Sequence, residues 1–277
     1  MVVNIHDRIT YDLTDRVARI ELAHAEAANS LGERMGDALR TAADHATRDA
    51  ANGDARVVVV SAQGRLFSVG GDLGEFAAAA DRGAAVKATA DHLHAGLTAL
   101  RALAVPVVSV INGTAAGGGL GIALVGDLVI AASEAKLVMA YTASGLTPDC
   151  GLSWIIPQRL TWARAMDLAL TNRVLTGAEA ADWGLVSRAV PREDLDATIE
   201  TVVSGLRDGA SNALASTKQL MLASVHRTMP EQMVEESASI SRVVDEPDGV
   251  EGVDAFLGKR SPSYLPGQAP AVVPVKA

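Results

Sequence analysis

The sequence is poor in several residue types, and each shortage excludes a class of protein. Its single cysteine, Cys150, permits neither an intramolecular disulfide nor a cysteine-ligated zinc site, a pattern that suits a reducing cytoplasm. Aromatic residues make up only 3% of the 277 residues, so small aliphatic side chains must fill the core. The 24 basic residues are outnumbered by 33 acidic ones, and the formal net charge of -9 argues against a nucleic-acid partner.

Long uninterrupted hydrophobic runs are also missing. The most apolar stretch, residues 105–140, is broken by glycines and by Asp127, Glu134 and Lys136, so it does not read as a transmembrane span. The first ten residues, MVVNIHDRIT, lack the charged segment and apolar run of a signal peptide. We therefore expect a cytoplasmic protein without a membrane partner.

The hydrophobic pattern predicts an α/β fold. The main segments are a hairpin at 9–12 and 17–22 that turns at Thr14-Asp15, helices at 31–50 and 86–104, and short strands at 57–61, 107–111, 128–131 and 137–140. Ser30 and Glu33 have the spacing of a capping box at the start of the first helix. The strands are too short and irregular for a Rossmann alternation, and the pattern after Pro191 is helical and acidic.

Two glycine-rich segments could expose backbone N–H groups. Residues 66–73, LFSVGGDL, follow a buried strand, and residues 112–121, NGTAAGGGLG, lead into a short helix. Free N–H groups at such turns can stabilise a developing oxyanion. The alternatives are a plain strand-to-helix turn for the first segment and close helix–sheet packing for the second. The glycine spacing matches neither a Walker loop nor a dinucleotide fingerprint.

A third segment, residues 141–154 (YTASGLTPDCGLSW), places one carboxylate, Asp149, in an otherwise apolar neighbourhood. Asp149 could serve there as a general base, or it could cap a helix that begins near Gly151. His92 and His94 are two residues apart on a predicted helix and point in different directions, so we expect no metal site from them.

These segments, in this order and spacing, resemble the crotonase (enoyl-CoA hydratase/isomerase) superfamily. The matching pieces are Asn29-Ser30-Leu31, FSVGGDL, INGTAAGGGLG, GLTPDCG, ADWGLVSRAVP at 181–191 and the tail motif at 251–262. The resemblance extends from about Ile9 to Tyr264. It implies a spiral of ββα units over 1–200, a helical region over 201–265 that forms homotrimers or hexamers, and a disordered tail over 266–277.

The same resemblance implies an acyl-CoA thioester as substrate, with coenzyme A as part of that substrate and no permanently bound cofactor. The N–H groups of Gly71 and Gly118 would form the oxyanion hole. The residues expected to contact coenzyme A are Ala27, Asp72 and Leu73 near the adenine, and Phe256 and Lys259 in the tail, the last two sometimes on a neighbouring subunit. The residues expected to line the acyl pocket are Leu120, Tyr141 and Trp154.

Two departures from the superfamily favour an isomerase over a hydratase. Where hydratases carry the two glutamates that hold the attacking water, this chain has Gly121 and Tyr141. Asp149, in contrast, falls where some enoyl-CoA isomerases place their catalytic Asp, and residues 137–151 resemble the phenylacetate-pathway isomerases. One base suffices for a 1,3-proton shift, so the sequence predicts that Asp149 moves a proton between two carbons of an enoyl-CoA.

Other readings remain open. The 4-chlorobenzoyl-CoA dehalogenases place a nucleophilic Asp at the position of Asp149 and a histidine base at that of His94, although Gly71 replaces a bulky aromatic residue of that group. His94 could equally be a surface residue beside the apolar stripe of its helix. A hydratase with an atypical site and a catalytically silent relative are further alternatives. We expect Asp149 to be essential and His94 to be dispensable.

Overall fold

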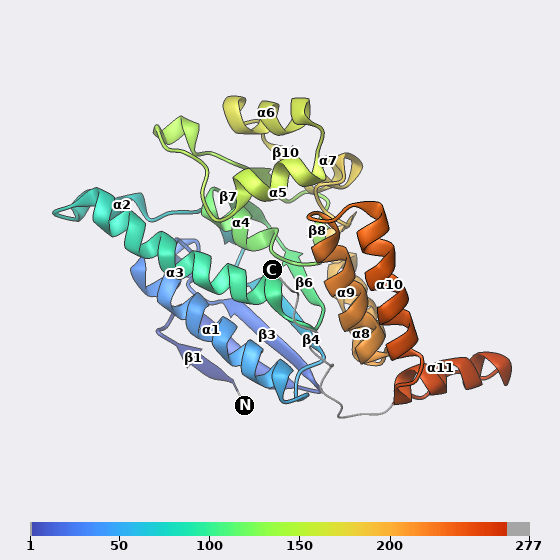
Figure 1. Cartoon of the computed structure of the whole chain (residues 1–277). Coiled ribbons are helices and arrows are strands. Elements are labelled where there is room, and N and C mark those ends of the chain that lie inside the picture. The colour runs from blue at the N-terminus through green and yellow to red at the C-terminus, as the bar shows by residue number, and fades with distance from the viewer. Residues whose placement is uncertain (1, 265–277) are drawn as a thin grey trace.

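The computed structural model describes residues 2–264, and its strands form two sheets (Figure 1). The larger sheet has the order β1-β2-β3-β4-β6-β8-β11, and the smaller has the order β10-β9-β7-β5. The strands are β1 (Val3–Ile5), β2 (Ile9–Thr14), β3 (Val17–Leu22), β4 (Val57–Ala62), β5 (Leu66–Ser68), β6 (Val107–Ile111), β7 (Thr114–Ala116), β8 (Leu128–Ala132), β9 (Lys136–Val138), β10 (Leu175–Thr176) and β11 (Arg188–Val190).

Helices surround these sheets and dominate the last third of the described chain (Figure 1). The α-helices are α1 (Glu33–Ala51), α2 (Leu73–Ala78), α3 (Arg82–Ala102), α4 (Gly118–Ala123), α5 (Leu152–Arg159), α6 (Trp162–Thr171), α7 (Gly177–Trp183), α8 (Leu195–Arg207), α9 (Ser211–Ser224), α10 (Met229–Val243) and α11 (Pro247–Leu257). Short 3₁₀ turns lie at Ala25–Ala27, Thr142–Ser144 and Arg192–Asp194. In the described range, no helix is both long and apolar enough to cross a bilayer. The predicted α/β class is confirmed.

The central strands of the larger sheet are parallel and buried, which explains their composition. β3, β4, β6, β8 and β11 pair in parallel, whereas β1, β2 and β3 pair antiparallel. The four valines that begin β4 are all buried, as expected for a strand covered on both faces. α1 packs against α3 and presents its buried stripe, which includes Met35 and Leu39, to the core. This packing fixes α3, the helix on which the site depends.

Two local predictions need correction. β2 continues to Thr14, so the hairpin turn is Asp15-Arg16, with the φ angles of 52° and 61° that a two-residue turn requires. Ser30 does not cap α1, because its hydroxyl donates to Asp72 Oδ2 at 3.0 Å. The N–H of Glu33 instead donates to Glu75 Oε1 at 2.9 Å, so a carboxylate from α2 replaces the predicted capping box.

The C-terminal helices are tied to the core by buried polar contacts. Lys218 on α9 pairs with Asp127 at 2.7 Å and donates to the carbonyl of Val105 at 3.1 Å. The boundary predicted after residue 200 falls inside α8, which contacts β4 and β8. α11 projects from the rest of the molecule (Figure 1). The predicted disordered tail, 266–277, lies outside the described residues.

Candidate active site

The backbone around Gly71 is held so that its own N–H faces a cavity. Leu31 donates its N–H to the carbonyl of Gly70 at 2.8 Å and accepts the N–H of Asp72 at 3.1 Å. Neighbouring residues of an extended chain turn their N–H groups to opposite sides, so that of Gly71 points away from Leu31. It has no hydrogen-bond acceptor within residues 2–264, and Gly71 lines a cavity of about 340 Å³.

Gly118 offers a second free N–H to the same cavity. It is the first residue of α4, where backbone N–H groups have no partner within the helix. The preceding Gly117 has φ 52° and ψ -132°, a conformation that essentially only glycine adopts. Among the described residues, no acceptor bonds to the Gly118 N–H. The two glycine-rich segments therefore each expose one amide on one cavity.

The buried Asn29 anchors the segment that leads to the first glycine loop. Its side-chain amide donates to the carbonyls of Gln63, Leu66 and Phe67 at 3.0 to 3.3 Å, and its Oδ1 accepts the N–H of His24 at 2.8 Å. Because Asn29 is fully buried, these bonds are shielded from water. They fix the strand that leads to Gly71.

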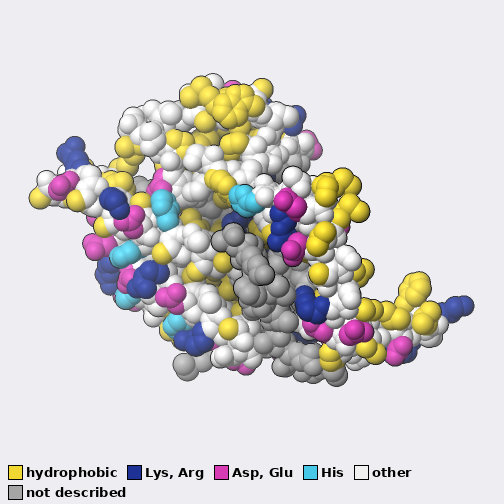
Figure 2. All heavy atoms as spheres, viewed as in Figure 1, with side chains coloured by type: hydrophobic (Ala, Val, Ile, Leu, Met, Phe, Trp, Pro, Cys, Tyr) yellow, Lys and Arg dark blue, Asp and Glu magenta, His cyan; other side chains and the backbone are white. Residues whose placement is uncertain are grey.

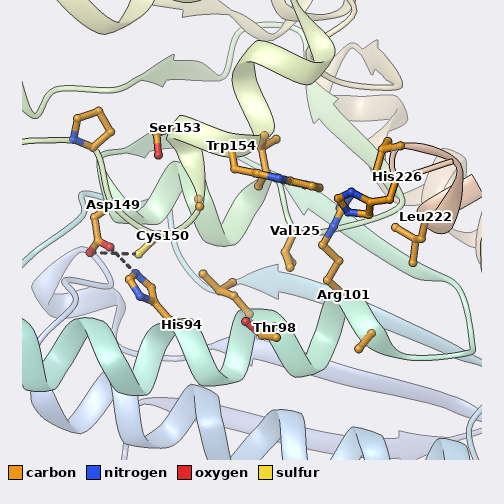
Figure 3. A pocket seen from close by; sticks show the side chains of 17 residues that line it. His94, Thr98, Arg101, Val125, Asp149, Cys150, Ser153, Trp154, Leu222 and His226 are labelled. Carbon is orange, nitrogen blue, oxygen red and sulfur yellow. Dashed lines mark hydrogen bonds and ion pairs between the residues drawn. The ribbon is translucent and has the colours of Figure 1, made fainter. Parts of the chain in front are cut away.

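Asp149 lies in a cluster with His94 and Cys150 (Figure 3). His94 Nε2, from α3, forms a short hydrogen bond with Asp149 Oδ1, and the Cys150 thiol donates to Asp149 Oδ2 at 3.7 Å. The side chains of His94 and Asp149 are 46% and 32% exposed, whereas Cys150 is buried. Burial and the adjacent Asp149 carboxylate raise the pKa of the Cys150 thiol well above its usual value. His94 is thus exposed on its helix and also contacts Asp149.

The same three side chains could also hold a cation. Their donor atoms all lie within 4.8 Å of one another. A nitrogen, a carboxylate oxygen and a sulfur suit zinc better than magnesium or calcium. His92 is not part of this cluster.

A larger cavity of about 680 Å³ lies on the other side of Asp149. Pro148, Asp149 and Cys150 line both cavities, so the Asp149 segment forms a shared wall. The larger cavity is bounded by α3, α4, α5 and the end of α9, and its lining is mostly apolar. Asp149 thus reaches both a space beside two free amides and a space for an apolar group.

The structure accounts for the two missing glutamates. A Cβ at Gly121 would lie 2.4 Å from Cys150 Cβ and 2.5 Å from its carbonyl oxygen, so no side chain fits there without movement of the backbone. Tyr141 lines the smaller cavity, and its buried hydroxyl has no partner within residues 2–264. Burial raises the pKa of Tyr141, so the phenol stays protonated at neutral pH. Neither position supplies a carboxylate.

The remaining predicted contacts fall in different places. Trp154 lines the larger cavity and Leu73 lines the smaller one. Leu120, on α4, is only 1% exposed and lines neither cavity, so it packs in the core and does not take the expected place in the pocket wall. Asp72 caps α2 by accepting the N–H of Glu75 at 3.0 Å.

The other expected coenzyme A contacts do not line either cavity of this chain. Ala27 ends a 3₁₀ turn and Asp72 is occupied by its capping bond. Phe256 is 82% exposed on α11, and Lys259 follows the end of that helix, which projects from the body (Figure 1). The expected contacts of Phe256 and Lys259 with coenzyme A require a neighbouring subunit, and the coenzyme A contacts of all four residues stay predictions.

Sequence reasoning missed several residues of the larger cavity. Thr98 and Arg101 on α3 and His226 after α9 line it together with His94. The signal was available in part, because His94, Thr98 and Arg101 follow a spacing of four and three residues and so share one helix face. Cys150 adjoins Asp149 in the sequence, whereas His226 has no such signal, since only the tertiary fold brings it to the site.

Comparison with known proteins places this geometry in a family. A sequence model of enoyl-CoA hydratase/isomerase matches residues 12–266. A Rhodobacter capsulatus protein named "probable enoyl-CoA hydratase" is 36% identical over 92% of this chain and 97% of its own length. The 1,2-epoxyphenylacetyl-CoA isomerase of Escherichia coli is 34% identical over 90% of this chain and 94% of its own.

Solved structures agree with this assignment. The crystal structure of an enoyl-CoA hydratase from Polaromonas superposes with a TM-score of 0.86 at 32% identity, covering 93% of this chain and 99% of that one. Sequence and structure together define an α/β protein with the crotonase fold. The chain belongs to the enoyl-CoA hydratase/isomerase family, and the resemblance stated from the sequence is confirmed.

Proposed function

We propose that the protein is an enoyl-CoA isomerase that uses Asp149 as its single acid–base group. The observation that carries the proposal is the position of Asp149 in the wall between the two cavities. On one side are the free N–H groups of Gly71 and Gly118, and on the other is a mostly apolar space. When a thioester carbonyl oxygen accepts hydrogen bonds from these two N–H groups, the acyl carbons of the substrate lie beside the carboxylate of Asp149.

The reaction is a 1,3-proton shift. Asp149 removes a proton from the carbon next to the thioester, and the electron pair moves onto the carbonyl oxygen to give a dienolate. The N–H groups of Gly71 and Gly118 stabilise that oxyanion, and a donor of this kind is worth roughly 3–4 kcal/mol in other enzymes. The protonated Asp149 then returns the proton to the carbon at the far end of the dienolate, and the double bond moves into conjugation.

His94 and Cys150 position the carboxylate in this proposal. His94 Nε2 faces one carboxylate oxygen and the Cys150 thiol faces the other. A hydrogen bond to each oxygen restricts rotation of the side chain, so a lone pair stays directed at the substrate. Because the pKa of Cys150 is raised, the thiol remains a neutral donor and adds no second negative charge to the site.

The names of the relatives support an isomerase without deciding its substrate. Alongside proteins named as hydratases stand the Escherichia coli 1,2-epoxyphenylacetyl-CoA isomerase and, at 28% identity over 92% of this chain, a trans-2-decenoyl-acyl-carrier-protein isomerase of Streptococcus mutans. Gly121 and Tyr141 weigh against hydration, because neither can hold and deprotonate water as a glutamate does.

One observation favours a second candidate, an aryl-CoA dehalogenase-like hydrolase. The contact between His94 and Asp149 brings together the two residues that such chemistry needs. Hydrolysis through an aryl ester, however, also requires a separate base that activates water. His94 is engaged with the carboxylate itself, so the arrangement suits proton transfer better.

The proposal includes assembly through the C-terminal helices. Hydrophobic side chains stand out over the start of α10 and along α11 (Figure 2), including Met229 at 76% and Ile240 at 72% exposed on α10, and Phe256 at 82% on α11. Apolar side chains gathered in this way mark interaction sites. A homotrimer, alone or paired into a hexamer, would cover them and could bring Phe256 to a neighbour's coenzyme A.

Turnover of trans-3-octenoyl-CoA in deuterated water tests the function directly. We expect an increase in conjugated trans-2-octenoyl-CoA absorbance, with deuterium incorporated at the carbons that exchange protons with Asp149. A parallel incubation with 4-chlorobenzoyl-CoA tests the alternative. Chloride release without any isomerisation would overturn the proposal in favour of the hydrolase.

A further inference from the structure

Arg101 lies in the larger cavity without a carboxylate partner. Its guanidinium stacks on the ring of Trp154 at 4.7 Å. Its guanidinium forms no hydrogen bond or ion pair within residues 2–264. An arginine offers five N–H donors, so a half-buried arginine in a mostly apolar cavity has donors available for a ligand.

The charges around Arg101 leave it unbalanced. Asp127 is the one acid that acts on it appreciably, but Asp127 is already paired with Lys218 at 2.7 Å. The neighbouring Arg159 adds positive charge and donates to the carbonyls of Leu124, Gly126 and Leu185. Burial lowers the pKa of Arg101, as expected for a cation that lacks a direct counter-ion.

Arg101 faces the end of the cavity that lies away from Asp149. Figure 3 places Asp149 at one end and Arg101 with His226 at the other, with Trp154 between them. His94 and Arg101 are seven residues apart on α3, which corresponds to about 10 Å along the helix axis. The wall between them is apolar and includes Leu97 and Val125.

We propose that the larger cavity binds an acyl chain whose far end carries a carboxylate, and that Arg101 binds that carboxylate. The substrate class is then a coenzyme A monothioester of an unsaturated dicarboxylic acid. This inference rests on the proposed function, because it takes the thioester to lie at Gly71 and Gly118. The apolar middle accepts the methylene groups, and Arg101, backed by Trp154, supplies the geometry that a carboxylate prefers.

Binding of saturated thioesters tests the inference without any turnover. Calorimetry would compare adipyl-, suberyl- and sebacyl-CoA with hexanoyl-, octanoyl- and decanoyl-CoA, pairs that differ mainly in the terminal carboxylate. At one of the three lengths, we expect the carboxylate to tighten binding on the order of 10- to 100-fold, the strength of a hydrogen bond to a charged group. Arg101→Gln should remove that difference, and Arg101→Lys should restore part of it.

Arg164→Gln is the matched control. Arg164 also stacks on a tryptophan, Trp183, at 4.7 Å, but it does not line the cavity. This variant should keep the preference for the carboxylate. Free coenzyme A is the third arm: it should bind wild type and Arg101→Gln equally, whereas weaker binding to the variant would mean that Arg101 holds a coenzyme A phosphate.

Two further outcomes overturn the inference. One is a wild-type protein that binds the methyl-ended thioesters at least as tightly at all three lengths, a comparison that needs no variant to fold. The other is an Arg101→Gln variant that weakens both members of a pair equally, which would reduce Arg101 to a structural stack on Trp154. If the wild-type protein shows no isomerase activity but still prefers the carboxylate-ended thioesters, the result would count against the proposed reaction alone.

Discussion

His94 Nε2 bonds directly to Asp149 Oδ1, although the two residues are 55 positions apart in the sequence. One lies on the long helix α3 and the other in the loop before α5. The contact gives Asp149 a fixed orientation in the wall between two cavities. We therefore propose that His94 positions Asp149 in the isomerase, whereas the sequence suggested a dispensable residue.

Substitution of His94 should reveal this role in the kinetics. His94→Ala removes the hydrogen bond and should lower kcat by about 10-fold with little change in KM, since a hydrogen bond to a charged group is worth roughly 1.5–3 kcal/mol. His94→Gln retains an N–H donor and should recover most of the activity. The measurement is steady-state isomerisation of both variants across pH. If His94→Gln is as inactive as His94→Ala, the imidazole acts as a base, and this result would favour the aryl-CoA dehalogenase-like function.

Hydration of crotonyl-CoA should be very slow. Without a glutamate at position 121 or 141, no second carboxylate can hold and activate water, and such a group typically contributes about 10²–10⁴-fold. Hydration is followed by the loss of enoyl-CoA absorbance. A turnover like that of efficient hydratases would show that another side chain activates water.

Introducing a side chain at Gly121 should destabilise the protein. A Cβ there would lie 2.4 Å from Cys150 Cβ, and overpacking of a core costs about 1–3 kcal/mol. Gly121→Ala should therefore lower Tm and impair isomerisation, because the displaced Cys150 adjoins Asp149. Gly145→Ala is the control without a clash, because no atom lies within 4 Å of the Cβ position at this exposed glycine. Its φ of 69° means that any loss of stability in this variant comes from backbone strain. Unchanged stability of Gly121→Ala would mean that the loop at Cys150 yields easily.

Cys150 should react slowly with iodoacetamide at neutral pH. Its thiol lines both cavities, but burial and the Asp149 carboxylate raise its pKa, and only the thiolate is nucleophilic. The folded protein thus keeps a proton that the unfolded chain releases in the ordinary thiol range. The contribution of Cys150 to the free energy of unfolding consequently falls as the pH rises above that range. Mass spectrometry of the native protein should show alkylation accelerating only at alkaline pH, and rapid labelling at neutral pH would contradict this account.

The C-terminal helices should mediate assembly. Light scattering at micromolar concentration is expected to give a trimer or a hexamer, because a monomer would leave Met229, Ile240 and Phe256 largely exposed to water. Ile240→Glu places a charge on this surface and should shift the distribution towards monomer. A monomeric wild-type protein would overturn the assembly proposal without touching the assignment of Asp149.

Sequence patterns predicted the fold well wherever local composition decides the structure. Buried valines identified β4, and adjacent glycines identified the two loops that expose amides. The failures arose where a distant segment supplies the partner. Glu75 from α2 replaces the expected cap of α1, and His94 meets Asp149 only because α3 crosses the loop before α5. Arg101 was missed because an arginine on a helix reads as a solvated charge until the cavity beside it is known.

The most direct test of the central claim is the isomerase activity of Asp149→Asn. This change keeps the size and polarity of the side chain but removes its ability to hold and return a proton. The account predicts that isomerisation of trans-3-octenoyl-CoA falls by about 10²–10⁴-fold or more, while coenzyme A binding and Tm stay close to those of wild type. Full isomerase activity in Asp149→Asn would contradict the account and require a different base.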